Sequence, residues 1–269
     1  MLDSPLLLIG CGKMGGAMLA GWLEIGLPPE TVVVEPHAAA MAPFAGRVRH
    51  VDSIASIPAD LTPAAVILAT KPQEAPAALP ALARFARPDT VFLSIMAGRT
   101  VAGMNALLGG AARVVRAMPN TPAALRLGFT VGYAGPGVTP AQRALCDTLL
   151  AAIGEAAWVE DEALIDPVTA VSGGGPAYVF LLAEVMEQAA LRQGLPPDLA
   201  RRMARATVAG SGALLGASTE DAGTLRRNVT SPKGTTERAL AVLMREEAWP
   251  ALMQEAIEAA TARSRELAG

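Results

Sequence analysis

Three glycines near the start of the chain have the spacing of a loop that binds nucleotide phosphates. Gly10, Gly12 and Gly15 form a GxGxxG pattern after the apolar run 6–10 and before a helical pattern. The first glycine permits a tight turn, the second lets the backbone approach a pyrophosphate, and the third allows close packing of helix on strand. The N-terminus of the helix then faces the phosphates. A glycine-rich turn without a ligand is the alternative, but the flanking strand and helix patterns favour dinucleotide binding.

An acidic residue at the end of the second apolar run adds to this pattern. Glu35 follows Gly15 at the distance where a carboxylate accepts hydrogen bonds from the ribose hydroxyls of an adenosine. The loop after Glu35, PHAAAM, holds no arginine to receive a 2′-phosphate, so these residues favour NADH, while NADPH stays open as the cofactor. The cofactor-binding residues predicted in this segment are Ile9, Gly10, Cys11, Gly12, Lys13, Met14, Gly15 and Glu35.

Three further loops follow predicted strands and are candidates for the same ligand. The loops ATKPQ (69–73) and SIMAG (94–98) leave the carboxyl ends of strands, where ligands bind in open α/β sheets. Their predicted cofactor-binding residues are Ala69, Thr70, Lys71, Pro72, Ile95, Met96 and Ala97. In MPNTPA (118–123), Asn120 is a candidate for the nicotinamide end. For 69–73 an ordinary strand-to-helix connection is the alternative, and for 118–123 a turn made by asparagine and proline.

A second candidate site lies in the segment RRNVTSPKGTTERAL (226–240). Ser231, Gly234, Thr235 and Thr236 come directly before or at the start of a predicted helix, whose free N–H groups and hydroxyls can bind a carboxylate. A helix cap without a ligand is the alternative. Lys233 adds a positive charge, and the other two lysines, Lys13 and Lys71, also fall within glycine- or proline-marked motifs. The distribution of lysines therefore favours a functional role for these segments.

The order of secondary-structure patterns defines the expected fold class. Apolar strand patterns at 6–10, 31–35, 64–70, 90–96 and 113–118 alternate with helical patterns, which predicts a doubly wound α/β domain. The strands are continuously apolar, as expected when helices cover both faces of a parallel sheet. Helices are predicted at 161–171, 176–193, 198–217, 235–246 and 249–267. The predicted domains are therefore an α/β domain over 1–160 and an all-α domain over 161–269.

Composition excludes several classes of protein. The 269 residues are 52% hydrophobic with a net charge of -3, which excludes a disordered chain and provides no basis for nucleic-acid binding. The charge-free stretch 167–183 is broken by glycine and proline, so no membrane span is expected. Two histidines and two distant cysteines without ligand spacing predict no metal site and no disulfide framework. No basic residue precedes Lys13, so a cytoplasmic protein is expected.

Taken together, the motifs resemble those of one enzyme family. GCGKMG, ATKPQ, SIMAG, MPNTP, SGGGPAYVF and VTSPKGTT occur in the order found in pyrroline-5-carboxylate reductases, over nearly the whole chain. The resemblance implies NAD(P)H-dependent reduction of 1-pyrroline-5-carboxylate to L-proline, the last step of proline biosynthesis. It also implies a Rossmann domain followed by a helical dimerisation domain, in a homodimer or a ring of dimers.

The resemblance also assigns residues to the substrate. It places the substrate carboxylate at Ser231, Gly234, Thr235 and Thr236, and it places Glu162 and Asn228 beside the ring. Because an iminium is already electrophilic and the product amine is strongly basic, no potent general acid is needed, and the hydroxyl of Thr236 or a water molecule can handle the proton. The chain departs from the usual motifs at Gly174, Lys233 and Met96, and it lacks a His-Pro pair before Leu225.

Two other functions are compatible with the first motif. A β-hydroxyacid dehydrogenase also begins with a GxGxMG turn, but its ketone chemistry needs a positioned lysine, and no lysine occurs between Gly175 and Lys233. A non-catalytic dinucleotide sensor is the second alternative. Cofactor binding without turnover would identify it.

Overall fold

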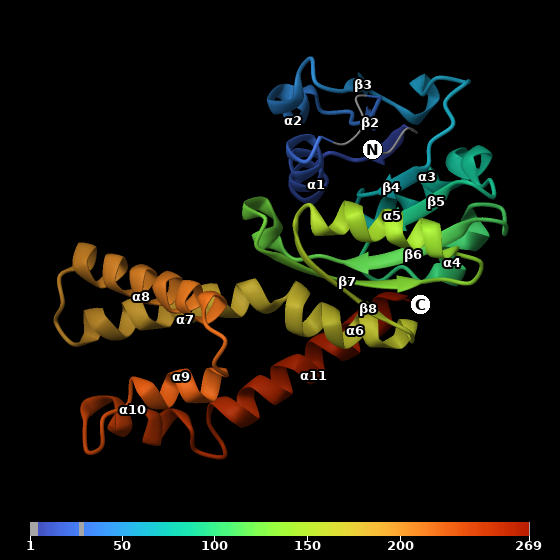
Figure 1. Ribbon diagram of the computed structural model, residues 1–269. Coiled ribbons are helices and arrows are strands. Elements are labelled where there is room, and N and C mark those ends of the chain that lie inside the picture. The colour runs from blue at the N-terminus through green and yellow to red at the C-terminus, as the bar shows by residue number, and fades with distance from the viewer. Residues whose placement is uncertain (1–4, 27–29, 269) are drawn as a thin grey trace. The chain divides into compact units, whose positions relative to one another are not determined.

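The computed structural model describes residues 5–26 and 30–268, which form two compact units (Figure 1). The first unit consists of Met1–Gly173 with Ala260–Gly269, and the second of Gly174–Ala259. The sequence places the domain boundary between residues 160 and 161, and that boundary stays a prediction. Residues 1 and 269, where the two predicted domains begin and end, lie outside the described residues.

An eight-stranded sheet forms the centre of the first unit in the order β3-β2-β1-β4-β5-β6-β7-β8. Its strands are β1 Leu6–Ile9, β2 Val32–Val34, β3 Arg49–Val51, β4 Ala65–Leu68, β5 Val91–Ser94, β6 Arg113–Met118, β7 Gly128–Ala134 and β8 Gly154–Val159. All neighbouring strands pair in parallel except β6 and β7, which are antiparallel. The chain runs from β1 outward to β3 and then returns to β4 on the other side of β1. The predicted doubly wound fold is therefore confirmed, and its switch point lies between β1 and β4.

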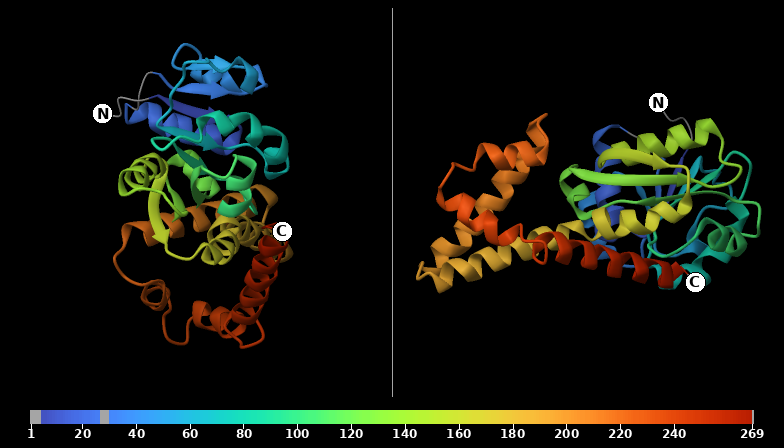
Figure 2. Two further views of the ribbon diagram at one scale, coloured as in Figure 1. Left: turned by 90° about the vertical axis from the view of Figure 1, so that its right-hand side faces the viewer. Right: turned by 90° about the horizontal axis from the view of Figure 1, so that it is seen from below.

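Helices cover both faces of this sheet (Figure 2). The helices of the unit are α1 Lys13–Glu24, α2 Ala38–Met41, α3 Ala75–Leu82, α4 Val101–Leu107, α5 Pro140–Ala151 and α6 Ile165–Val168. Leu6 and Leu8 of β1 pack in one core cluster with residues of α1 and α5, while Leu7 and Ile9 pack in the other with residues of α3 and α4. Burial on both faces explains why the strands are continuously apolar.

Three strands do not appear in the sequence prediction. Strand β3 has only three residues, and Arg49 and His50 within it are exposed. Strand β7, GFTVGYA, carries two glycines, and β8, GEAAWV, is half-buried. None of the three has the continuous apolar run that marks the central strands.

The second unit is helical, as predicted. It contains α7 Gly175–Arg192, α8 Pro197–Ala217, α9 Ala222–Asn228, α10 Thr235–Leu243 and the beginning of α11 Trp249–Ala268. Helices α7 and α8 form an antiparallel pair joined by a short turn (Figure 1). Among the described residues of this unit, α9 is the one helix that the sequence did not predict.

Candidate functional site

Two of the three loop glycines are required by the fold itself. Gly10 has a φ of 91°, and a Cβ atom there would lie 2.9 Å from the carbonyl oxygen of Ala69. At Gly15 a Cβ atom would overlap the carbonyl oxygen of Gly10. A side chain at either position therefore conflicts with backbone, as expected for the turn glycine and for the glycine at the contact of helix and strand.

Gly12 differs from these two glycines because space surrounds it. Its φ of -68° suits any residue, and a Cβ atom there would meet nothing within 4 Å. Gly12 is also the N-cap of α1, and no side chain caps that helix. Open space therefore adjoins Gly12 at the N-terminus of α1, the positive end of the helix dipole, which fits a pyrophosphate.

A cavity of about 420 Å³ lies beside this loop. It is lined by Ile9, Gly10, Gly12, Val34, Glu35, Pro36, His37, Asp52, Ser53, Ile54, Ala69, Thr70, Lys71, Glu74 and Ala78. Most of these residues lie at or shortly after the carboxyl ends of β1, β2, β3 and β4, on both sides of the switch point, and Ala78 lies in α3. The cavity therefore occupies the place where doubly wound sheets bind nucleotides.

Glu35 is held in this cavity by backbone hydrogen bonds on both of its carboxylate oxygens. Cys11 N donates to Oε2 over 2.8 Å and His37 N donates to Oε1 over 2.9 Å. The residue is only 6% exposed. Burial, followed by the negative charge of Glu35, raises the pKa of the Cys11 thiol to about 11. Glu35 thus supports the glycine loop, and its predicted contact with ribose stays a prediction.

The loops after β4 and β5 contact each other. Thr70 Oγ1 donates a hydrogen bond to Met96 Sδ over 3.8 Å, and Met96 N donates to Ser94 Oγ over 3.2 Å. Met96 is buried, so this residue, which departs from the family pattern, is part of the core under the site. Among the predicted cofactor residues in these two loops, Ala69, Thr70 and Lys71 line the cavity.

Asn120 connects two motifs that are far apart in the sequence. Its Nδ2 donates to Ser172 Oγ over 3.2 Å, and its Oδ1 accepts from Phe129 N over 2.9 Å. The MPNTP motif therefore lies beside Ser172, the first residue of the SGGGP motif, and Asn120 is fixed between Ser172 and Phe129. Its predicted role at the nicotinamide end is compatible with this placement and stays a prediction.

Glu162 is partly buried and belongs to an ionic network around the buried Arg116 in the first unit. Its Oε1 accepts from Arg116 Nη1 over 3.2 Å and from Val101 N over 2.8 Å. Arg116 Nη2 also pairs with Asp166 Oδ1 over 3.4 Å, and Ser264 Oγ donates to that oxygen over 2.7 Å. Glu162 therefore pairs with an arginine and caps the N-terminus of α4, and its predicted substrate contact stays a prediction.

The predicted carboxylate-binding residues gather at the N-terminus of α10 in the second unit. Gly234 is the N-cap and no side chain caps the helix, while the exposed Thr235 and Thr236 are its first two residues. Gly234 N donates to Ser231 O over 3.0 Å, which closes the preceding turn. Lys233 has a φ of 61°, in the left-handed region, and its N–H donates to Glu237 Oε2 over 2.8 Å. Asn228 ends α9 and donates to Glu220.

Several cavity residues do not appear in the sequence prediction. Asp52, Ser53 and Ile54 follow β3, Pro36 and His37 follow β2, Glu74 ends the short 3-10 helix after β4, and Ala78 lies in α3. Recognising β3 as a strand would have pointed to the first three, because carboxyl ends of parallel strands meet at one edge. Strand β3 was not predicted because its exposed side chains do not form a continuous apolar run.

Comparisons with known proteins cover both units. A family model described as pyrroline-5-carboxylate reductase dimerisation matches residues 162–267, and one described as NADP oxidoreductase, coenzyme F420-dependent, matches residues 6–98. The chain is 41% identical over 263 residues to the pyrroline-5-carboxylate reductase of Pseudomonas aeruginosa, covering 97% of this chain and 95% of that protein. It is 33% identical to the Escherichia coli enzyme, covering 99% of both.

Solved structures agree with these relatives. The pyrroline-5-carboxylate reductase of Coxiella burnetii superimposes with a TM-score of 0.90 at 31% identity, covering 99% of both chains. The Plasmodium falciparum enzyme, solved with NADP bound, superimposes with a TM-score of 0.82 at 23% identity, covering 100% of both chains. The latter similarity shows the fold alone.

Proposed function

The chain belongs to the pyrroline-5-carboxylate reductase family, and we propose that it reduces 1-pyrroline-5-carboxylate to L-proline with NAD(P)H. The observation that carries this proposal is the 41% identity to a curated reductase over 97% of the chain. The glycine loop by itself supports only a dinucleotide, since many dehydrogenases have one. The reaction is the last step of proline biosynthesis.

The first unit supplies the coenzyme site in this proposal. Gly10, Gly12 and Gly15 with the N-terminus of α1 bind the pyrophosphate, and Glu35 is directed to the adenosine ribose. The remaining proposed cofactor residues are Ile9, Cys11, Lys13, Met14, Ala69, Thr70, Lys71, Pro72, Ile95, Met96, Ala97 and Asn120. The open space at Gly12 and the cavity of about 420 Å³ support this assignment.

The second unit supplies groups for the substrate carboxylate. The uncapped N-terminus of α10 offers backbone N–H groups, and Ser231, Thr235 and Thr236 add hydroxyls. A Cβ atom at Gly234 would lie 2.9 Å from the backbone oxygen of Ser231, so glycine permits the close turn before these N–H groups. Glu162 and Asn228 are proposed to border the ring, although in the structure each also has a protein partner.

The chemistry of an imine sets modest demands on the protein. Bound NAD(P)H supplies a hydride for the carbon of the C=N bond. An iminium is already electrophilic and the product amine is strongly basic, so no strong general acid is required. The hydroxyl of Thr236 or a water molecule handles the proton at the ring nitrogen.

We expect Thr236→Ala to lower turnover about tenfold with coenzyme affinity unchanged, because the variant loses only a hydroxyl that handles a proton. Steady-state kinetics and a coenzyme titration measure the two quantities. Thr236→Ser, which retains the hydroxyl, is the matched control and should keep most of the activity. Equal turnover in Thr236→Ala and the unaltered protein would remove Thr236 from the proposed role.

The activity itself is tested by following oxidation of NADH and NADPH by the purified protein, with and without 1-pyrroline-5-carboxylate. Proline must be identified as the product. Turnover on a β-keto acid in place of the pyrroline would point to a hydroxyacid dehydrogenase. Coenzyme binding without turnover on either substrate would point to a dinucleotide sensor.

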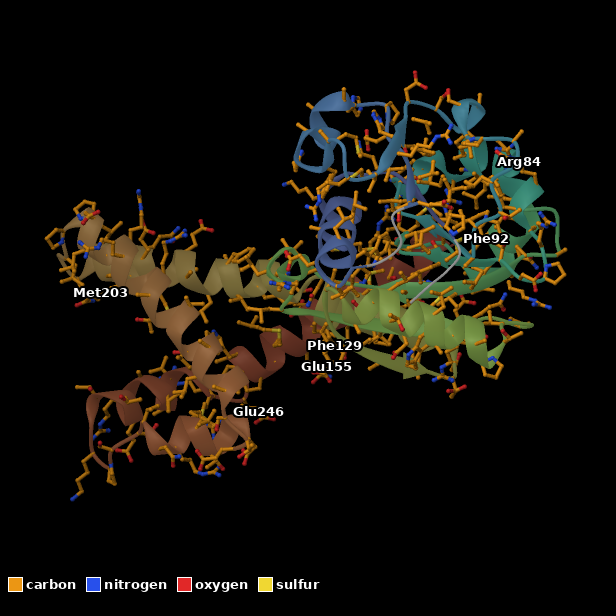
Figure 3. All side chains as sticks on the ribbon, turned by 45° about the horizontal axis from the view of Figure 1, so that its top comes forward. Arg84, Phe92, Phe129, Glu155, Met203 and Glu246 are labelled. Atoms are coloured by element: carbon orange, nitrogen blue, oxygen red, sulfur yellow. The ribbon has the colours of Figure 1, made fainter. Side chains whose placement is uncertain are left out.

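We also propose that the protein is a homodimer formed through its helical unit, or a ring of such dimers. Among the described residues of this unit, the buried hydrophobic side chains are Ala200 and Ala204, while Phe180 is 67% and Leu214 57% exposed. A groove of about 870 Å³ runs between α7 and α8, and Met203 on its wall is labelled in Figure 3. An apolar surface of this kind is typical of a permanent interface. The match to a dimerisation family supports the same interpretation.

We expect Phe180→Asp to shift the protein from dimer to monomer, because a charge in an apolar interface leaves a carboxylate buried without a partner. Analytical ultracentrifugation measures the change, and native mass spectrometry distinguishes a dimer from a ring of dimers. Phe180→Leu is the control, since it preserves an apolar side chain. A dimer of undiminished stability in Phe180→Asp would place the interface elsewhere.

A cytoplasmic location without membrane insertion completes the proposal. One helical stretch, Glu162–Arg192, is long enough to cross a membrane and contains an 18-residue window with a mean hydropathy of 1.3, so it qualifies by length and composition alone. The proposed dimer interface provides another explanation for its exposed apolar residues, because α7 lies within this stretch.

A further inference from the structure

Glu35 is fixed at more points than a ribose contact requires. Besides the two carboxylate bonds from Cys11 N and His37 N, its backbone N–H donates to Val51 O over 3.0 Å. Its backbone oxygen lies 2.8 Å from His50 Nε2. Turning the carboxylate away would leave the buried N–H of Cys11 without an acceptor, which is costly. The negative charge of Glu35 is therefore held in place.

Other acidic groups surround the same cavity. Asp52 and Glu74 line it together with Glu35, against one lysine, Lys71, among the described lining residues. Hydrogen bonds from Ser56 and Ser53 lower the pKa of Asp52, so this carboxylate is ionised at neutral pH. His37 is the other lining residue that can carry a positive charge. With His37 neutral, the lining bears a net negative charge.

The arginine closest in sequence to the carboxyl ends of β2 and β3 does not line the coenzyme cavity. Arg49 lies on β3 and lines a separate cavity with Glu30 and Asp60. Among the described residues that line the coenzyme cavity there is no arginine. An arginine near the end of the second strand is the usual partner of a 2′-phosphate.

From this arrangement we propose that the protein selects NADH over NADPH, with Glu35 as the principal determinant and Asp52 as a second one. The inference rests on the proposed coenzyme site. A ribose 2′-hydroxyl can donate to the acceptor positions that remain on the Glu35 carboxylate. A 2′-phosphate has no proton to donate there and brings about two negative charges to a cavity that is already acidic.

Calorimetric titration of the unaltered protein with NADH and with NADPH tests the selection without catalysis. We expect NADPH to bind at least about tenfold more weakly, with a smaller difference at high ionic strength because salt screens the repulsion. ADP-ribose and its 2′-phosphorylated form should show the same ratio, which locates the effect in the adenosine half. NADPH binding as tight as NADH would overturn the proposal.

Two variants identify the residues responsible. Glu35→Gln and Asp52→Asn each remove a charge with little change of shape, and each should improve NADPH binding relative to NADH by about threefold or more. Glu30→Gln, in the separate cavity, is the matched control and should leave the ratio unchanged. If Glu35→Gln does not fold, the Asp52 variant and the salt dependence remain as tests. An unchanged ratio in both charge variants would overturn the assignment to these residues.

Coenzyme binding and turnover separate the selection of NADH from the reductase activity. Equal binding of the two coenzymes overturns the selection and leaves the reductase activity standing. Weaker binding of NADPH than of NADH, without turnover, supports the selection of NADH and overturns the proposed reductase activity.

Discussion

Replacing Gly12 with valine is expected to leave the protein folded while weakening NADH and NADPH binding about 100-fold or more, since the side chain would enter the space proposed for the pyrophosphate. The backbone at Gly12 suits any residue, and a Cβ atom meets nothing within 4 Å. The cost to stability is the loss of a glycine N-cap, at most about 1 kcal/mol. Coenzyme titration and thermal unfolding measure the two effects.

Gly15→Ala is the informative contrast to this variant. Its Cβ atom would overlap the carbonyl oxygen of Gly10, so α1 or the loop must move. We expect a clear fall in thermal stability for Gly15→Ala and almost none for Gly12→Val. If Gly12→Val binds both coenzymes normally in a folded protein, the glycine loop does not bind the pyrophosphate.

Replacing Arg116 with methionine is expected to destabilise the protein by about 3 kcal/mol or more, because removing one member of a buried ion pair leaves the others unpaired. Arg116 is 1% exposed and is the partner of both Glu162 and Asp166. Asp166 is also buried, at 7% exposure, and would retain the hydrogen bond from Ser264. Chemical unfolding at a fixed protein concentration measures the loss.

The matched control is Arg263→Met, which breaks an exposed ion pair with Glu266 in the same unit. The side chains of Arg263 and Glu266 are 66% and 63% exposed, so we expect the free energy of unfolding to change by less than about 1 kcal/mol. A similar small change in Arg116→Met would show that the buried network contributes little to stability.

Local patterns predicted most of the central sheet. The five strands with continuous apolar runs and the long helices of the second half lie where the sequence places them, because burial on both faces demands apolar residues in succession. Strands β3, β7 and β8 lack that pattern, and their pairing with neighbouring strands defines them. The strands that pair with them are separated from them along the chain, so no pattern within β3, β7 or β8 indicates the pairing.

The chemical family could be inferred from the sequence alone, because it depends on short motifs. GxGxxG, Glu35 and the segment before α10 each need specific residue types at fixed spacing, and these are visible without coordinates. Predictions about individual side chains are less complete. The substrate contact of Glu162 stays a prediction, and its protein partners, Arg116 and the backbone of Val101, lie 46 and 61 residues away along the chain, where no local pattern indicates them.

The sequence by itself therefore determined the doubly wound fold, the helical second half and the candidate residues for a coenzyme and a carboxylate. Only the tertiary structure decided how Glu35 is held, which acidic residues share its cavity, and that Ser264 near the C-terminus contacts Asp166. The physical reason is the range of the interactions. Turns and periodic burial depend on neighbours in sequence, whereas hydrogen bonds and cavities depend on residues that only folding brings together.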